Sequence, residues 1–521
     1  MGMLPERPVP GAGRRRGDQW ILPCFCLGCS LFLFLETFVP PFTPRAAAGD
    51  QAIYLHNAAR MFEGQMIYRD YDHFTPPGTD VLYFALFRLF GIRAWIPQAL
   101  LVVVGVLIVY LSFKICRHLL SGPAAYLPGL LFLVLPFTGY LDATHHWYST
   151  LAAMAALAVL MQERTPFRLA WAGALWGLGT CFAQSLVLGP VGLALFLVWE
   201  RRRRKESGAL LLRKEASVLV GYLGVIAGFN SYFVWKVGWH RFVYYTLIFV
   251  AKYYPADSSN TWRAYMAWRP SLHLWTDWPE LPAWGLIHFI VPMVYLLFFV
   301  RYWRDSRRQV AVPWERLMLV NITGLSMFLM VASAAAYNRL YTVALPALIL
   351  LVWFLDSPFK LERALLRCLW VLVALLAVVK PVVTQMRWKA VLDLPTGRTA
   401  FFSPVFYEKT KWLLQRTRPS DYFFGDQFVG FALKLRNPGR IAFVTSSDYT
   451  RPEEVSDLLQ GLERHQVRFV SWYGDLDNVP TAPRGDHLGP LRRYLREHYR
   501  VAETFSNGDE IWERKPESSE D

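Results

Sequence analysis

Ionisable and aromatic side chains gather in one polar segment of an otherwise apolar chain. This segment, GDQAIYLHNAARMFEGQMIYRDYDHFTPPG, spans residues 49–78 and carries Asp50 directly after the first apolar run. A carboxylate held beside low-dielectric lipid can act as a general base, because burial and neighbouring charges tune its pKa. An aspartate in front of QAIYL is equally suited to cap a helix. The sequence alone leaves catalysis and capping open for Asp50.

A second polar stretch, LDATHHWYST at residues 141–150, adds Asp142, His145 and His146. Aspartate and histidine are ligands that bind divalent metals. Adjacent histidines of a helix point in different directions, so a joint site does not follow from their spacing. The alternatives for this stretch are a divalent metal bound by Asp142 and His145, or a polar rim at the membrane surface. No other cofactor is predicted.

Cations at the ends of apolar runs are candidates for binding an anionic substrate. Arg339 lies in AAAYNRLYTVALPALIL, at one end of an apolar run. Charges at membrane depth are costly and often functional, and arginine pairs well with phosphate oxygens. Arg339 is therefore a candidate phosphate ligand, with a snorkelling anchor as the alternative. Lys252 is a second candidate, whose alternative is a lipid headgroup contact, and Gln184 is a third.

The composition predicts two parts of different character. Of the 521 residues 54% are hydrophobic and only 18% charged, against about a quarter charged in soluble proteins. Long apolar runs fill residues 1–385, whereas residues 386–521 resemble an ordinary soluble domain. The net charge of +15 resides mostly in short loops between apolar runs, and no nucleic-acid-binding signature accompanies it. We therefore predict a polytopic α-helical membrane domain followed by a small soluble domain, and no nucleic-acid partner.

Runs of about 18 or more apolar residues predict membrane-spanning helices. There are about eleven such runs, near residues 20–41, 95–115, 122–139, 146–161, 168–183, 185–200, 216–236, 282–301, 315–335, 340–356 and 363–383. Basic residues fall in every second loop, for example Arg14–Arg16 and Arg201–Lys205, and the positive-inside rule makes these loops cytoplasmic. An odd number of helices then places the N-terminus in the cytoplasm and the C-terminal domain outside it.

Two outer loops, residues 43–94 and 237–281, are too long to be simple connections. Both contain many aromatic residues and apolar positions at helical spacing, which predicts short amphipathic helices on the membrane surface. The soluble tail alternates strand-like and helix-like runs and predicts a small α/β domain. Its strands are expected at 441–446, 467–473 and 509–514, and its helices at 452–465 and 488–499.

The order of these features resembles the C-type glycosyltransferase superfamily. An apolar helix is followed by GDQAIY, then by GQMIYRDYDHFTPPG, YFALFRLFG and a second helix. The nearest branches are glycosyltransferase family 39 with the protein O-mannosyltransferases, the aminoarabinose transferases of lipid A, and the Rgt-type lipopolysaccharide glycosyltransferases. In these proteins the first outer loop carries an acid just after helix one, and a Tyr-x-Asp…Pro-Pro segment follows about twenty residues later.

The resemblance implies transfer of a sugar, a hexose or pentose, from a polyprenyl-phosphate donor to an acceptor at the periplasmic face of a bacterial inner membrane. The acceptor is a lipid, a glycan or a protein. Asp50 matches the acid of the first loop and becomes the base of an inverting displacement, and Asp142 loosely matches a second acid of the family. Tyr68 and His73 become candidates for donor-phosphate contacts. This chain departs from the family at Thr75, where the relatives carry Lys or His before the Pro pair.

Two other functions remain alternatives to a glycosyltransferase. A transporter or lipid flippase places ionisable groups within the membrane and often shows repeated halves. Here the polar groups lie at the outer ends of the apolar runs and no repeat is visible. A non-catalytic membrane scaffold is the second alternative. Replacing Asp50 by asparagine separates an enzyme from both.

Overall fold

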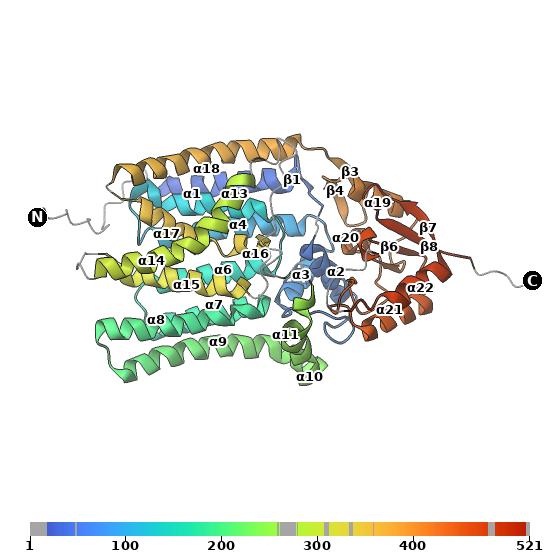
Figure 1. The fold of residues 1–521 in the computed structure, drawn as a ribbon, viewed down its shortest axis with the longest axis horizontal. Coiled ribbons are helices and arrows are strands. Elements are labelled where there is room, and N and C mark those ends of the chain that lie inside the picture. Colours follow the sequence, from blue (N-terminus) through green and yellow to red (C-terminus); the bar gives the residue numbers. More distant parts are fainter. Residues whose placement is uncertain are drawn as a thin grey trace, which may run out of the picture.

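The computed structural model describes residues 18–46, 49–257, 260, 278, 280–306, 312–332, 337–357, 359–477 and 485–516. Long helices run side by side along the longest axis, and the C-terminal part of the chain lies at one end of this bundle (Figure 1). The long helices are α1 (Asp18–Thr37), α4 (Ile96–Cys116), α6 (His145–Leu160), α7 (Pro166–Phe182), α8 (Leu188–Arg204), α9 (Gly208–Val237), α14 (Val291–Ser306), α15 (Trp314–Ala332), α17 (Leu345–Leu355) and α18 (Lys360–Met386).

Six helices are long and apolar enough to cross a membrane, judged by length and composition. They are Trp20–Thr37, Ile96–Cys116, Gly208–Val237, Leu281–Ser306, Trp314–Val331 and Lys360–Met386. The other five predicted runs are also helical, but their helices are shorter than the roughly 18 residues that a crossing needs. The polytopic helical fold class is therefore confirmed, and the count of eleven crossings stays a prediction.

Shorter segments connect the long helices. They are β1 (Phe38–Val39), β2 (Thr43–Pro44), α2 (Asp50–Phe62), α3 (Gly78–Phe90), η1 (Gly122–Tyr126), α5 (Leu127–Phe132), η2 (Leu133–Phe137), η3 (Gln184–Val187), α10 (Trp239–Val243), η4 (Tyr244–Phe249), α11 (Val250–Lys252), η5 (Tyr254–Ala256), α13 (Leu281–Gly285), η8 (Leu286–Ile290) and α16 (Tyr337–Thr342). The helices predicted within both outer loops are thus present.

Glycines let α7 and α9 approach each other closely. A Cβ atom on Gly173 would lie 2.1 Å from the Val218 carbonyl oxygen, and one on Gly221 would lie 1.9 Å from the Ala170 carbonyl oxygen. Such contacts exclude any larger residue at these two positions. Small residues at helix interfaces are typical of membrane proteins, where close van der Waals packing drives helix association.

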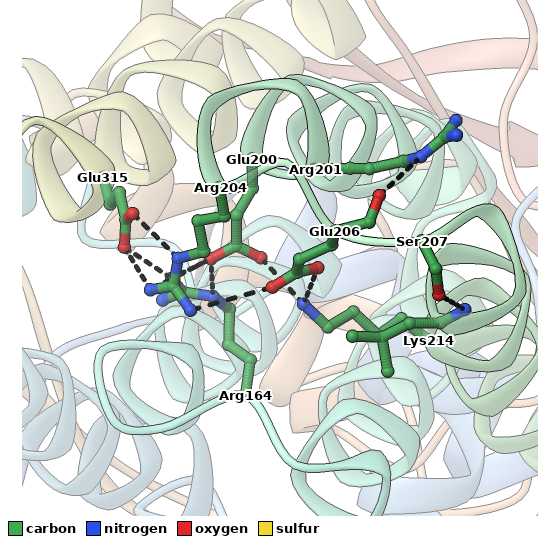
Figure 2. A network of polar contacts seen from close by, with 9 residues as sticks. Arg164, Glu200, Arg201, Arg204, Glu206, Ser207, Lys214 and Glu315 are labelled. Atoms are coloured by element: carbon green, nitrogen blue, oxygen red, sulfur yellow. Dashed lines mark hydrogen bonds and ion pairs between the residues drawn. The ribbon is translucent and has the colours of Figure 1, made fainter.

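A network of ion pairs ties α8, α9 and α15 to the loop between α6 and α7, where α8 turns into α9 (Figure 2). The Glu200 carboxylate is fully buried and accepts from Arg164 Nε at 2.8 Å and from Lys214 Nζ at 3.4 Å. Arg164 also donates to Glu315 at 3.2 Å, and Lys214 donates to Glu206 at 2.6 Å. Every buried charge of this network therefore has an oppositely charged partner, as burial requires.

The basic residues of the α8–α9 region and the candidate catalytic residues lie at opposite ends of the bundle. The end of α8 and the turn into α9, which together contain Arg201–Lys205, are at one end, and α2, α3 and the C-terminal sheet are at the other (Figure 1). This arrangement agrees with the predicted alternation of basic and polar loops. The side of the membrane that each end faces stays a prediction. Arg14–Arg16 and residues 261–277 of the second outer loop lie outside the described residues.

The C-terminal part contains a hairpin and a four-stranded sheet with the order β5-β6-β8-β7. The β5–β6 pair is parallel and the other two pairs are antiparallel. The elements are β3 (Ala390–Leu394), β4 (Gly397–Phe401), α19 (Pro404–Leu414), β5 (Phe423–Phe424), α20 (Gln427–Ala432), α21 (Pro452–Arg464), β6 (Phe469–Trp472), η9 (Gly474–Asp477), α22 (Gly489–His498), β7 (Tyr499–Thr504) and β8 (Glu510–Arg514). Both predicted helices and two of the three predicted strands are present.

The strand predicted at 441–446 is wrong, because this segment is irregular. Side chains, and not a neighbouring strand, form several of the hydrogen bonds to its backbone. Asn437 Nδ2 donates to the Ile441 carbonyl at 2.9 Å, and Gln427 Nε2 donates to the Ala442 carbonyl at 2.8 Å. The Thr445 amide donates to Thr450 Oγ1 at 2.7 Å. Local side-chain bonds of this kind compete with sheet formation.

The hydrophobic core of the bundle continues into the C-terminal part. The Phe87 ring of α3 stacks on Phe431 of α20 at 5.9 Å, and a second core around Leu458, Leu462 and Val470 lies beneath the sheet. Helix α2, predicted to lie on the membrane surface, is instead enclosed by α3 and α20 and buries eight of its residues. The proposed domain boundary at residue 385 stays a prediction.

Candidate active site

Asp50 is the first residue of α2, and its carboxylate does not cap the helix. Gly49 occupies the N-cap position with φ at 65°, a conformation that favours glycine, and no side-chain cap is formed. The capping alternative for Asp50 is therefore wrong. The Asp50 side chain lines a cavity between α2, the second outer loop and the C-terminal part.

The loop between η2 and α6 fixes the start of α2. Asp142 Oδ1 accepts from the Gln51 amide at 3.0 Å, and Gln51 Oε1 accepts from the Ala143 amide at 2.5 Å. A Cβ atom on Gly49 would lie 3.1 Å from Asp142 Oδ2. An acid is favourable at this helix N-terminus, where backbone amides lack partners. Asp142 therefore positions Asp50.

We call the cavity beside Asp50 the acidic cavity; its volume is about 160 Å³. Its lining includes four carboxylates and seven phenylalanine or tyrosine rings from three parts of the chain: Asp50, Asp72, Asp257, Glu454, Tyr54, Phe74, Tyr245, Phe249, Tyr254, Phe443 and Tyr449. Burial raises the pKa of Asp50, the charge of Arg339 lowers it, and the charge of Asp257 raises it. A raised pKa brings the carboxylate closer to the range where it can accept a proton at neutral pH.

A second cavity, which we call the methionine cavity, adjoins the first and has a volume of about 370 Å³. Met327, Met330 and Val331 contribute an apolar wall, and His146 and Gln184 contribute polar groups. Gln184 Nε2 also donates to the Phe74 carbonyl at 3.1 Å. The mixture of a broad apolar wall with a few polar groups suits an amphipathic molecule.

Phe74, His145, Tyr254 and Arg339 line both cavities and form their shared wall. The Arg339 guanidinium donates to the Tyr254 hydroxyl and, at 2.8 Å, to Asn260 Oδ1. These two partners hold the cation at the junction of the cavities.

His145 and His146 lie close together, with ring centroids 3.9 Å apart. His145 Nδ1 is 2.6 Å from the Tyr54 hydroxyl, so one of its two ring nitrogens already has a protein partner. Asp142 is likewise engaged by the Gln51 amide. No group of three His, Cys, Asp or Glu side chains suited to a metal occurs in the described part of the chain. The residues described here therefore do not fit the metal site considered for Asp142 and His145.

The Thr75 region forms a buried framework behind the shared wall. His73 Nε2 lies 2.5 Å from Thr75 Oγ1, and the Tyr68 hydroxyl donates to the Thr75 carbonyl at 2.5 Å. Tyr68 is fully buried and lies outside the linings of both cavities. His73 lines the acidic cavity, and burial lowers its pKa to about 3. The Gly78 Cα packs against the Cys181 carbonyl, where a Cβ atom would lie at 2.4 Å.

Lys252 is exposed and stands outside the linings of both cavities. Its ammonium group lies 4.8 Å from the centre of the Tyr253 ring. This position suits the alternative of a contact at the headgroup level better than a place in the site.

The C-terminal part closes the acidic cavity. Arg440 donates to Asp72 Oδ1 from Nη2 at 2.6 Å and from Nε at 3.1 Å, and the Tyr245 hydroxyl donates to the same oxygen. We call these three residues the latch, because they join the first outer loop, the second outer loop and the C-terminal part. Ile441, Phe443, Tyr449 and Thr450, directly after Arg440, line the cavity.

Tyr54, Tyr254, Asp257 and the wall after Arg440 also line the acidic cavity and were not predicted from the sequence. Tyr54 lies four residues after Asp50, which places both on one face of a helix, so this position was accessible from the sequence. The wall after Arg440 carried no such signal, because it reaches the site only through tertiary packing.

A family model described as dolichyl-phosphate-mannose-protein mannosyltransferase matches residues 75–235. The structure of ArnT from Cupriavidus metallidurans is similar over 96% of this chain and 98% of its own, with 15% identity and a TM-score of 0.55. The oligosaccharyltransferase AglB from Archaeoglobus fulgidus is similar over 96% of this chain and 75% of its own, with 12% identity and a TM-score of 0.53. A search of curated proteins gave no significant match.

Proposed function

The fold is that of the C-type glycosyltransferases, and from it we propose that the chain is an inverting glycosyltransferase that uses a polyprenyl-phosphate-linked sugar. The observation that carries this proposal is the junction of two unlike cavities, with Asp50 in one and Arg339 between them. The description of the matched family names a dolichyl-phosphate-linked sugar, and the AglB structure contains dolichol-phosphate. Both support a lipid phosphate as the donor's carrier.

In this proposal the donor lies in the methionine cavity and the acceptor lies in the acidic cavity. The isoprenoid chain would pack against the apolar wall of Met327, Met330 and Val331. Arg339 would pair with the phosphate, since guanidinium matches phosphate oxygens well. The sugar would then lie at the shared wall, next to Asp50.

The reaction is a single displacement at the anomeric carbon. An acceptor hydroxyl oxygen forms the new bond to that carbon while the bond from carbon to phosphate oxygen breaks, and its electron pair stays on the phosphate. The Asp50 carboxylate takes the proton of the hydroxyl, and Arg339 stabilises the charge on the departing phosphate. Attack from the side opposite the phosphate inverts the anomeric configuration.

We also propose that the site faces the periplasm, with the basic turn between α8 and α9 in the cytoplasm. The separation of these two regions at opposite ends of the bundle supports this orientation. Labelling of single cysteines placed beside Asp50 and in the α8–α9 turn, with a reagent that does not cross the membrane, tests it.

The activity is tested by incubating the purified full chain with a panel of hexosyl and pentosyl polyprenyl phosphates and following donor consumption. Asp50→Asn is expected to lower the rate by about 10²-fold or more, because general base catalysis contributes about 10²–10⁴-fold. Asp70→Asn is the matched control: it lies in the same loop, outside both cavities, and pairs with Arg69 at the surface. Equal rates for Asp50→Asn and the unchanged protein would refute the role of Asp50.

A further inference from the structure

A continuous line of polar side chains runs behind the shared wall and ends at His145. Asn57 Nδ2 lies 3.2 Å from His73 Nδ1, and His73 Nε2 lies 2.5 Å from Thr75 Oγ1. Tyr54 donates its hydroxyl proton to Thr75 Oγ1 at 3.2 Å, and the same hydroxyl lies 2.6 Å from His145 Nδ1. We call these five residues the polar chain. It is built from α2, the segment before α3 and the start of α6.

The polar chain is shielded from bulk solvent, and four of its five members, Tyr54, His73, Thr75 and His145, also line one or both cavities. Asn57, Tyr54 and Thr75 are at most 2% exposed, and His73 is 6% exposed. Buried polar groups require hydrogen-bond partners, and these side chains find them in one another. His145 lines both cavities, so the ring nitrogen that Tyr54 does not use, Nε2, is the one available to a bound molecule.

The first half of the polar chain has one consistent order of donors and acceptors. His73 is neutral, since burial lowers its pKa to about 3, and a neutral imidazole has one N–H and one lone pair. Asn57 presents its amide N–H to Nδ1, so the N–H of His73 is on Nε2. His73 therefore donates to Thr75 Oγ1.

The order of donors and acceptors in the second half of the polar chain follows from the single proton of the Tyr54 hydroxyl. Tyr54 gives that proton to Thr75 Oγ1, which has two lone pairs and accepts from His73 as well. The Tyr54 oxygen can then only accept at its contact with His145, so the N–H of a neutral His145 is on Nδ1. Nε2 carries the lone pair and meets the junction of the two cavities as an acceptor.

We propose that His145 Nε2 accepts a hydrogen bond from a hydroxyl group of the transferred sugar, and that Tyr54 and Thr75 are positioning residues that fix the required tautomer. This inference rests on the proposed function, which places the sugar at the shared wall. Thr75 thereby gains a role at the position where the related proteins carry Lys or His. Its hydroxyl acts through Tyr54 and His145.

Thr75→Val tests the order of donors and acceptors in the polar chain, because valine keeps the shape of the side chain and removes the acceptor oxygen. The Tyr54 proton then turns to His145 Nδ1, and the N–H of His145 moves to Nε2. Nitrogen-15 chemical shifts of the labelled full chain, assigned with His145→Gln, are expected to show Nδ1 protonated in the unchanged protein and in Thr75→Ser, and Nε2 protonated in Thr75→Val. Identical His145 shifts in all three would overturn the proposal, and this readout does not depend on transfer activity.

Monofluorinated sugar donors test the contact itself, since fluorine accepts weakly but cannot donate. For the donor that the unchanged protein consumes, one fluoro-substitution is expected to raise KM about tenfold, as expected for one lost hydrogen bond. Thr75→Val is expected to remove most of this discrimination and Thr75→Ser to keep it. Absence of any penalty for every monofluorinated donor would overturn the sugar contact, whereas absence of transfer from any donor would refute the proposed function.

Two buried residues of the same types provide matched controls. Thr79 and Tyr71 are fully buried, and neither hydroxyl has a hydrogen-bond partner among the described residues. Thr79→Val and Tyr71→Phe are expected to leave the His145 shifts and the fluoro-discrimination unchanged. If Thr75→Val does not fold, Tyr54→Phe replaces it: loss of the Tyr54 oxygen releases Nδ1–H, and a mixture of tautomers is expected. A single Nδ1–H tautomer in Tyr54→Phe would overturn the proposal.

Discussion

Asp72→Asn is expected to loosen the wall that the C-terminal part contributes to the acidic cavity. The Asp72 side chain is 11% exposed and its Oδ1 accepts two N–H groups of Arg440 together with the Tyr245 hydroxyl. Asparagine keeps the shape and one oxygen acceptor but removes the negative charge. The latch residues would stay in contact through hydrogen bonds from the Arg440 cation and Tyr245 to a neutral amide oxygen.

The magnitude follows from the difference between charged and neutral hydrogen bonds. Bonds to charged groups contribute about 1.5–3 kcal/mol and neutral ones about 0.5–1.5 kcal/mol, so the loss is at most about 1–2 kcal/mol, because Arg440 keeps its charge. The Arg440 side chain is 29% exposed, and solvent screening moves the expectation toward about 1 kcal/mol. Local opening of residues 440–450 should then become roughly five- to tenfold more frequent.

Hydrogen–deuterium exchange of the purified full chain measures this opening directly. The amides of Arg440, Thr445 and Thr450 are hydrogen-bonded within the C-terminal part and should exchange faster in Asp72→Asn. Helix α21, which packs in the separate core around Leu458, should keep its exchange rate. Asp70→Asn in the same loop should leave the exchange rates of both residues 440–450 and helix α21 unchanged.

Two outcomes would refute this reasoning. Unchanged exchange of residues 440–450 would mean that the latch does not hold the wall. Equally faster exchange in α21 would mean that the substitution destabilises the whole C-terminal part. In a double-mutant cycle with Arg440→Met, additive effects would show that the two side chains are not coupled.

Further predictions concern pH and stability. Asp50 acts as a base only when ionised, and its pKa is raised by burial, so transfer should be present above that pKa and decline as the pH falls through it. Arg339→Gln removes a charge that lowers this pKa and should move the acid limb of kcat/KM to higher pH, whereas Asp257→Asn should move it to lower pH. Glu200→Gln should lower the free energy of unfolding by about 2–3 kcal/mol, less than the 3–5 kcal/mol of a fully unpaired buried charge because its arginine and lysine keep other acidic partners. Thermal unfolding in detergent checks this. Glu206→Gln, which removes a more exposed partner of the same lysine, should lower the free energy of unfolding by a smaller amount.

The sequence predicted the general arrangement of the site because its signals are local. A charge at the end of an apolar run is visible without any structure, which is how Asp50 and Arg339 were identified, and both line the acidic cavity. Helical spacing and capping residues are also local, so α21 and α22 were predicted nearly to the residue. The resemblance to the C-type glycosyltransferases is confirmed at the level of the fold.

What the sequence could not predict depends on contacts between distant segments. The strand expected at 441–446 had suitable residues, but the side chains of Gln427, Asn437 and Thr450 took its hydrogen bonds. The role of Asp142 at the start of α2 depends on a contact across 91 residues. No local pattern encodes such a contact, and residue type alone suggested a metal ligand instead.

Helix α2 connects the proposed base with the proposed sugar-binding histidine. Asp50 and Tyr54 are separated by one turn and therefore lie on the same face, which lines the acidic cavity. The helix is fixed at its start by Asp142 and along its length by α3 and α20, so it cannot rotate independently of them. Any shift of α2 would move Asp50 and the hydroxyl that orients His145 together. In the proposed reaction this rigid element couples proton removal to sugar orientation, which would account for the burial of the first outer loop between the bundle and the C-terminal part.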